Sequence, residues 1–206
     1  MISLRDDKQG ISKNESIPSF VADSSNTRVV ILHDSLCGKI NDTLLSRENI
    51  HSQKIWAPDL NEMKKKLEDI RNTETIVIQA LTRDVSSQSV EEINDGVKQV
   101  VDKALSKAKN VVISTIVARD DKKEVKMKAE LVNASLKYTF MDNDKVYICD
   151  NNNLNDQKFR LEDGIHLTPH GTAILATNLK YKIAESLKIK VVKKDHNGRR
   201  SYWGNS

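Results

Sequence analysis

The chain has 206 residues and a net charge of +4, and 38% of its residues are hydrophobic while 30% are charged. This length suits one α/β domain, and the composition is typical of a protein with a well-hydrated surface. No stretch reaches the roughly 18 apolar residues of a membrane-spanning helix, and no signal peptide is evident. We therefore expect a cytoplasmic protein, and the two cysteines, Cys37 and Cys149, do not indicate a disulfide framework.

Both ends of the chain differ in composition from its middle. Residues 1–26 are polar and lack an apolar period, which predicts a disordered leader before a domain over residues 27–190. Residues 191–206 are expected to form a basic, flexible tail. The basic residues near this end are Lys188, Lys190, Lys193, Lys194, Arg199 and Arg200. We expect them to make any weak contact with nucleic acid or an anionic surface, with Tyr202 and Trp203 available for base stacking.

Five apolar runs predict buried strands of a parallel sheet, because they are continuous and not alternating. They are Arg28–Leu32, Ile50–Trp56, Thr75–Ala80, Asn110–Ile116 and Lys145–Cys149. Helical patterns lie between them. Asp59 and Ser89 each precede a glutamate by three residues, which is the capping-box spacing, and Thr168 with Pro169 predicts the start of the last helix.

Strands that alternate with helices imply right-handed crossovers and therefore a three-layer α/β/α domain. For five parallel strands we predict the flavodoxin-like order 2-1-3-4-5. Ligands bind such sheets at the carboxyl ends of the first and third strands, where the order reverses. The segments to inspect are His33-Asp34-Ser35 and Leu81-Thr82-Arg83-Asp84.

Ser35 follows the first strand and precedes a short helix expected near Lys39–Leu45. Its hydroxyl is a candidate nucleophile, although a serine in such a turn is more often a helix cap. Asp163-Gly164-Ile165-His166 precedes the last helix, and the aspartate can accept a hydrogen bond from the histidine ring. The ring would then be free to take a proton from a serine. Taken alone, this segment is also compatible with an ordinary surface turn.

These segments resemble two motifs of the SGNH (GDSL) hydrolases. Val29-Val30-Ile31-Leu32-His33-Asp34-Ser35 is similar to the first block of that family, and residues 163–171, Asp-Gly-Ile-His-Leu-Thr-Pro-His-Gly, resemble its last block. The resemblance implies the SGNH hydrolase fold, with Ser35 as nucleophile, His166 as general base and Asp163 as its orienting partner.

The oxyanion hole departs from the family pattern. The family has a glycine after the second strand and Gly-x-Asn-Asp after the third, whereas this chain has Trp56-Ala57-Pro58-Asp59 and Leu81-Thr82-Arg83-Asp84. Removal of one oxyanion donor lowers turnover by about 10²–10³-fold. The candidate oxyanion and substrate-binding residues are Arg83, Thr82, Asp34 and Arg119. Arg83 is the evident replacement for the asparagine, but an ion pair with Asp34 or Asp84 is an equal alternative.

Three classes of function therefore remain. The first is a serine esterase or deacylase that acts on a small ester, without metal or cofactor. The second is a weak or inactive SGNH-like binding module of the kind that mobile elements encode, attached to nucleic acid by its basic tail. The third, a receiver-like signalling domain, explains the Asp163–His166 segment poorly. Cys37 is an alternative nucleophile, although a small buried thiol is the more common role of such a cysteine. Asn133 and Asp150 are expected to be structural.

Overall fold

The computed structural model describes residues 27–41, 45–46, 50–117, 119–189, 191–194 and 200–203. Five parallel strands form one sheet in the order β2-β1-β3-β4-β5, which confirms the predicted order. Their bounds are β1 Thr27–His33, β2 Ile50–Trp56, β3 Thr73–Gln79, β4 Ala108–Ser114 and β5 Val146–Cys149. The runs predicted for β3 and β4 are displaced by about two residues because the pairing of the two strands already begins at Thr73 and Ala108, before their continuous apolar runs.

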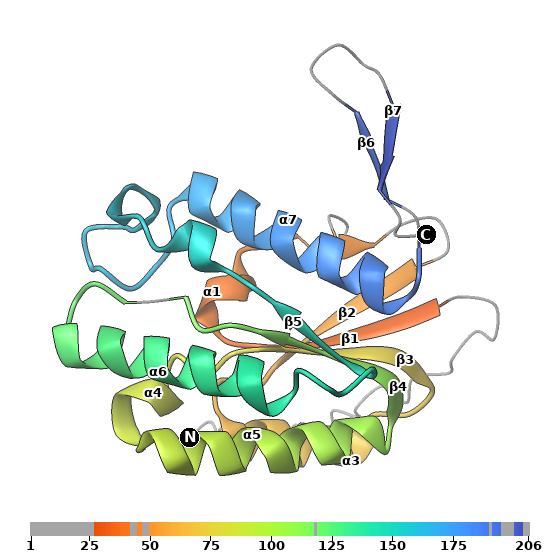
Figure 1. Ribbon diagram of the computed structural model, residues 1–206, viewed down its shortest axis with the longest axis horizontal. Helices are drawn as coiled ribbons and strands as arrows, with labels where there is room; N and C mark the ends of the chain where they lie inside the picture. Colours follow the sequence, from red (N-terminus) through yellow and green to blue (C-terminus); the bar gives the residue numbers. More distant parts are fainter. Residues whose placement is uncertain are drawn as a thin grey trace, which may run out of the picture.

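Helices cover both faces of the sheet, as the predicted three-layer architecture requires (Figure 1). One face packs on α3 (Leu60–Asp69), α5 (Val90–Leu105) and α6 (Lys123–Thr139). The other face packs on α1 (Ser35–Gly38) and α7 (Pro169–Ser186). Alternate residues of β1 point to opposite faces of the sheet. Val30 and Leu32 pack in the core on the first face and Val29 and Ile31 in the core on the second, and all four are fully buried.

The predicted helix starts are confirmed where the structure describes them. Ser89 and Glu92 form a reciprocal capping box at α5, and Thr168 caps α7 with Pro169 in its first turn. Asp59 accepts a hydrogen bond from the Glu62 N–H at α3. The sequence did not indicate α1, which starts at Ser35 itself with Asp34 as its cap. The short helix expected near Lys39–Leu45 includes residues 42–44, which lie outside the described residues.

The strand register determines which loops meet at the carboxyl edge of the sheet. His33 of β1 pairs with Trp56 of β2 on one side and with Gln79 of β3 on the other. The Asp34 N–H then donates to the Gln79 carbonyl, and the Ala57 N–H donates to the His33 carbonyl. The segments that follow β1, β2 and β3 therefore lie side by side.

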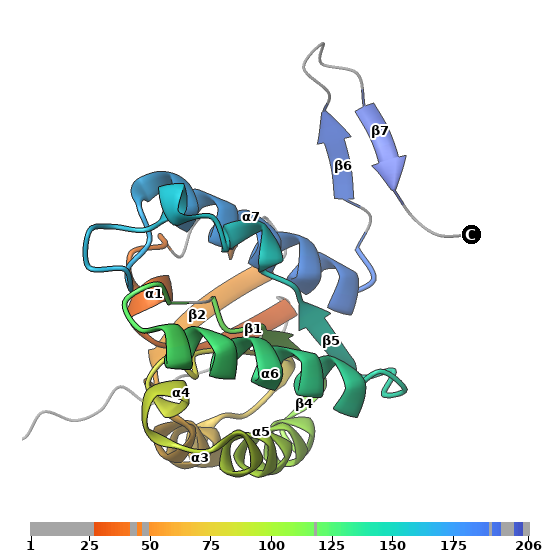
Figure 2. The ribbon, with the colours of Figure 1, turned by 60° about the vertical axis from the view of Figure 1, so that its left-hand side comes forward.

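Further short elements complete the described chain. They are α4 (Asp84–Ser87), the 3₁₀ turns η1 (Asn152–Leu154) and η2 (Gln157–Phe159), and an antiparallel hairpin of β6 (Val191–Lys194) and β7 (Arg200–Trp203) (Figure 2). The hairpin lies where the sequence indicated only a flexible tail. The predicted leader lies outside the described residues. Within the described part, no helix combines the length and apolar character needed to cross a membrane.

Candidate active site

Ser35 is held near the carboxyl end of β1 by its neighbours. It is the first residue of α1 and is exposed. The cap of this helix is Asp34, whose Oδ1 accepts a hydrogen bond of 3.0 Å from the Leu36 N–H. The interpretation of Ser35 as a helix cap is therefore wrong, and its hydroxyl is not committed to that task. Cys37, the alternative nucleophile, is fully buried in the core, so a substrate does not reach its thiol.

His166 is oriented by Asp163 through three contacts. Asp163 Oδ2 lies 2.7 Å from Nδ1 of the ring, and Oδ1 accepts the N–H groups of Ile165 and His166 at 2.8 Å each. These bonds, the one to the His166 ring first, hold the pKa of the Asp163 carboxyl well below its usual range. Since an ionised carboxylate only accepts, Nδ1 carries the proton, and Nε2 is the acceptor of the neutral ring.

The loop that carries His166 is fastened to the loop after β4. Gly164 has a φ of +66°, and its carbonyl accepts a 2.8 Å bond from the Asp120 N–H. A Cβ at this position would lie 2.8 Å from the Asp121 backbone nitrogen. A second bond, from the Leu161 N–H to the His166 carbonyl at 2.8 Å, closes the loop on itself. Gly164 is thus required both for its conformation and for its close approach to the neighbouring loop.

Ser35 and His166 line one cavity of about 280 Å³ at the carboxyl edge of the sheet. Within the described part of the chain, no hydrogen bond joins the two side chains. The remaining residues that line it are Asp34, Trp56, Pro58, Thr82, Arg83, Ser86, Arg119 and Ile165. All four candidate oxyanion and substrate-binding residues of the sequence analysis are therefore at this cavity.

Arg83 reaches the cavity from the N-terminus of α4 and remains accessible, with 64% of its side chain exposed. The ion pair expected with Asp34 or Asp84 is wrong. Arg83 Nη1 lies 3.3 Å from Asp59 Oδ2, and Asp84 instead accepts from the Leu60 N–H and from Gln88 Nε2. Asp84 is thus used to join α3 to α4.

Asp34 and Thr82 form the floor of the cavity on the side of Ser35, and both are buried. Burial raises the pKa of Asp34, and this effect is opposed by hydrogen bonding with Thr82 and the Leu36 N–H.

The side chain of Arg119, unlike that of Arg83, is held in place, and only 14% of it is exposed. Its Nε and Nη2 donate to the two oxygens of Asp121 at 2.9 and 2.6 Å, and its Nη1 donates to Ser86 Oγ at 2.6 Å. The arginine lowers the pKa of Asp121. This arrangement joins the loop after β4 to α4 across the mouth of the cavity.

Two residues after β2 explain why a conventional oxyanion hole is incomplete. Pro58 lines the cavity but has no N–H to donate, and the N–H of Ala57 is already bonded to the His33 carbonyl at 2.9 Å. The sequence indicated a missing glycine here, although not that Pro58 would line the same cavity as Ser35. The roles of Trp56, Ser86 and Ile165 at the cavity were also missed, since no motif marks them.

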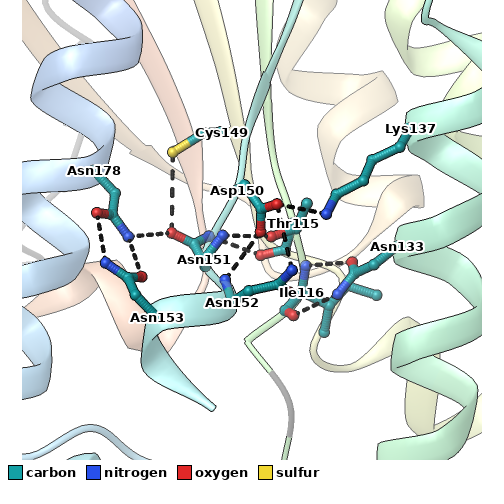
Figure 3. Close-up of polar contacts among 10 residues, drawn as sticks. All are labelled: Thr115, Ile116, Asn133, Lys137, Cys149, Asp150, Asn151, Asn152, Asn153 and Asn178. Atoms are coloured by element: carbon teal, nitrogen blue, oxygen red, sulfur yellow. Dashed lines mark hydrogen bonds and ion pairs between the residues drawn. The ribbon is translucent and has the colours of Figure 1, made fainter.

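Buried asparagines brace the loops after β4 and β5 (Figure 3). Asn133 of α6 bonds both the N–H and the carbonyl of Ile116 at 2.8 Å. Asn151 donates to Ser114 Oγ and the Thr115 carbonyl, and its oxygen accepts from Asn178 of α7. These bonds fix the segments that lead to Arg119 and to His166, which confirms the structural role predicted for Asn133.

Comparisons with known proteins identify the fold. No family model matches the chain, and no curated protein matches its sequence. A GDSL-like lipase from Bacteroides thetaiotaomicron matches with a TM-score of 0.65 at 16% identity, over 78% of this chain and 89% of the lipase. The C-terminal catalytic domain of peptidoglycan O-acetyltransferase A from Streptococcus pneumoniae, with a methylsulfonyl adduct, matches with a TM-score of 0.58 at 15% identity, over 80% and 93%.

A third match is the psychrotrophic esterase EstA from Pseudoalteromonas sp., inhibited by monoethylphosphonate, with a TM-score of 0.58 at 12% identity over 79% of this chain and 100% of the esterase. These similarities show that the chain has the fold of the SGNH (GDSL) hydrolases. The fold class implied by the two sequence motifs is therefore confirmed, and the low identities mark the chain as divergent.

Proposed function

We propose that this chain is a serine ester hydrolase of the SGNH type. One observation carries the proposal: His166, whose ring is held by Asp163 at 2.7 Å, and the exposed Ser35 line one small cavity although they lie at opposite ends of the domain sequence. A packed scaffold does not need an imidazole oriented by a carboxylate and an uncommitted hydroxyl at the same cavity.

Each residue has a definite task in this reaction. His166 Nε2 takes the proton of Ser35 Oγ as that oxygen attacks the ester carbonyl, and Asp163 stabilises the imidazolium. The tetrahedral adduct collapses, the alcohol leaves with the proton from His166, and an acyl group stays on Ser35. A water molecule, activated by the same histidine, then releases the acid and restores the hydroxyl.

Arg83 is our candidate for stabilising the oxyanion, in place of the family's asparagine. Its present ion pair with Asp59 is exposed, so breaking it costs only about 0–1 kcal/mol. The guanidinium can then turn toward the cavity that it already lines, where it supplies several N–H donors and a fixed charge. The similarity of the fold to a GDSL-like lipase and to an inhibited esterase supports ester chemistry at this position.

Steady-state hydrolysis of 4-nitrophenyl esters with acyl chains of increasing length tests the proposal. We expect turnover by the parent chain, preference for short acyl groups because the cavity is small, and loss of turnover in Ser35→Ala and His166→Ala. Ser106→Ala is the matched control, because this exposed serine at the end of α5 lies away from the cavity. Equal rates for the parent and Ser35→Ala would contradict the proposal.

A non-catalytic binding module is the second candidate, and the turn after β2 favours it. Because Pro58 supplies no N–H and the Ala57 N–H is already used, the oxyanion hole depends on Arg83. If no ester is hydrolysed, the cavity remains a binding site on an inactive scaffold. Attachment to nucleic acid by the basic tail stays a prediction, since of its cations only Lys188 is described with its side chain.

A further inference from the structure

Arginines outnumber acidic residues among the described residues that line the cavity. Two guanidinium groups, those of Arg83 and Arg119, line it beside Ser35 and His166. Among the described residues that line it, Asp34 is the one acid, and it is buried. The carboxylates that neutralise the arginines, Asp59 and Asp121, lie outside this lining. A ligand in the cavity therefore meets cationic groups before it meets their counterions.

The side chain of Arg119 is held in one position and still has N–H groups with which it can bind a ligand. Its bonds to Asp121 and Ser86 use one N–H on each nitrogen, and a guanidinium has five, so two N–H groups remain. Because 14% of the side chain is exposed and it is held at three points, little conformational entropy is lost when it binds a ligand. Arg83, which is 64% exposed and held by one contact, lacks this preorganisation.

The position of Arg119 relative to the proposed nucleophile is equally informative. Ser86, which it contacts, lies on α4 one turn after Arg83, since the Ser86 N–H donates to the Arg83 carbonyl. The two arginines therefore flank one serine at the side of a cavity of only about 280 Å³. In so small a cavity, a group bound by Arg119 is close to an ester bond presented to Ser35.

We propose that Arg119 determines specificity by holding an anionic group, such as a carboxylate, close to the scissile ester bond. This inference rests on the proposed function for the assignment of the ester, although the anion site itself does not require catalysis. It names the substrate class as small esters that carry a negative charge. Arg83 remains the group that faces the developing oxyanion, so the two arginines have separate tasks.

Two pairs of substrates test the proposal and locate the charge. The first pair compares 4-acetoxybenzoate with 4-acetoxybenzamide, so that the negative charge is on the alcohol part of the ester. The second pair compares the 4-nitrophenyl monoester of succinate with 4-nitrophenyl butyrate, so that the charge is on the acyl part. We expect one pair to show a preference for the anion in kcat/KM of about ten- to hundredfold, as for a hydrogen bond to a charged group. Arg119→Gln should abolish this preference. A preference that is absent from both pairs, or that persists in Arg119→Gln, overturns the proposal.

Further variants separate charge recognition from a structural effect. Asp121→Asn removes the negative charge but keeps one oxygen that accepts from Arg119, whose Nη1 still donates to Ser86 Oγ, so the preference for the anion should increase. If Asp121→Asn abolishes the preference as well, the position of the loop is responsible and the proposal is wrong. Arg71→Gln is the matched control, because this exposed arginine just before β3 lies at the opposite, amino edge of the sheet. It should leave the preference unchanged, and a loss there would indicate a long-range effect and contradict a local site.

A binding measurement keeps this inference separate from catalysis. 4-Acetamidobenzoate and 4-acetamidobenzamide replace the ester by an amide, and calorimetric titration compares them on the parent chain and on Arg119→Gln. Tighter binding of the carboxylate to the parent, lost in the variant, supports the anion site even if no ester is hydrolysed. Equal affinity for the two compounds overturns it even if ester hydrolysis is found.

Discussion

Gly164→Ala is expected to impair the candidate site with little effect on the rest of the fold. The glycine has a φ of +66°, where alanine costs about 1–2 kcal/mol. The new methyl group would also lie 2.8 Å from the Asp121 backbone nitrogen, against an ordinary contact of about 3.5 Å. Because backbone atoms oppose it there, the loop with Asp163 and His166 has to move by about half an ångström or more.

A displacement of this size acts on the reaction more than on folding. Misplacement of a catalytic group by about 1 Å lowers rates by about 10²-fold, so we expect kcat/KM to fall by about ten- to a hundredfold. The free energy of unfolding should fall by no more than about 1–2 kcal/mol, because the exposed loop can move and relieve the strain.

The assay combines ester hydrolysis with unfolding by urea, and Gly38→Ala is the control. A Cβ at Gly38 meets no atom within 4 Å, although this residue ends the same short helix that Ser35 begins. The control should keep its activity and its stability within about 0.5 kcal/mol. Full activity in Gly164→Ala would refute the reasoning that the contact between Gly164 and the loop after β4 positions His166.

Substitutions at three other residues test separate parts of the account. Arg83→Ala should change the free energy of unfolding by only about 0–1 kcal/mol, because the ion pair of Arg83 with Asp59 is exposed. It should lower kcat by about 10²–10³-fold, and Arg83→Lys should restore little of this loss. Unchanged kinetics would rule out the oxyanion role of Arg83. Leu81 is fully buried and has a φ of +82°, so Leu81→Gly removes apolar burial but also relieves backbone strain. The loss of burial should outweigh the relief and lower the free energy of unfolding in urea by about 1–4 kcal/mol. Equal stability of the variant and the parent would contradict this balance. Burial raises the pKa of Asp34 above 3.8, so the folded state binds that proton more tightly than the unfolded chain, and stability should fall as pH rises through the raised pKa. Asp34→Asn, which can still accept from the Leu36 N–H, should flatten this fall in stability above about pH 4, and an unaltered profile would contradict it.

The fold could be predicted from the sequence because its signals are local. Runs such as Val29 to Leu32 are apolar at every position, and this is required of strands that are buried on both faces. Polar residues placed at the first turns of α5 and α7 marked where those helices begin. Once strands and helices alternate, the handedness of the crossovers leaves few possible topologies.

The candidate site could be predicted only in part. Ser35 and His166 were identified because they follow recognisable motifs, and their proposed catalytic roles remain predictions. The partner of Arg83 was not foreseen, because it depends on the residue-level register between β1, β2 and β3, which brings Asp59 beside the turn after β3. The contact between Arg119 and Ser86 joins two loops distant in sequence, and no periodic pattern reports such a contact.

Covalent labelling at Ser35 tests the central claim most directly. The parent chain and Ser35→Ala are incubated with a fluorophosphonate, and the modified residue is located by mass spectrometry of the digested protein. The choice of reagent follows from the similarly folded esterase solved in a form inhibited by monoethylphosphonate. We predict one adduct, at Ser35, that is lost in Ser35→Ala and strongly slowed in His166→Ala, because the histidine activates the hydroxyl. Absence of labelling in the parent, or equal labelling in Ser35→Ala, would contradict the assignment of Ser35 as a nucleophile.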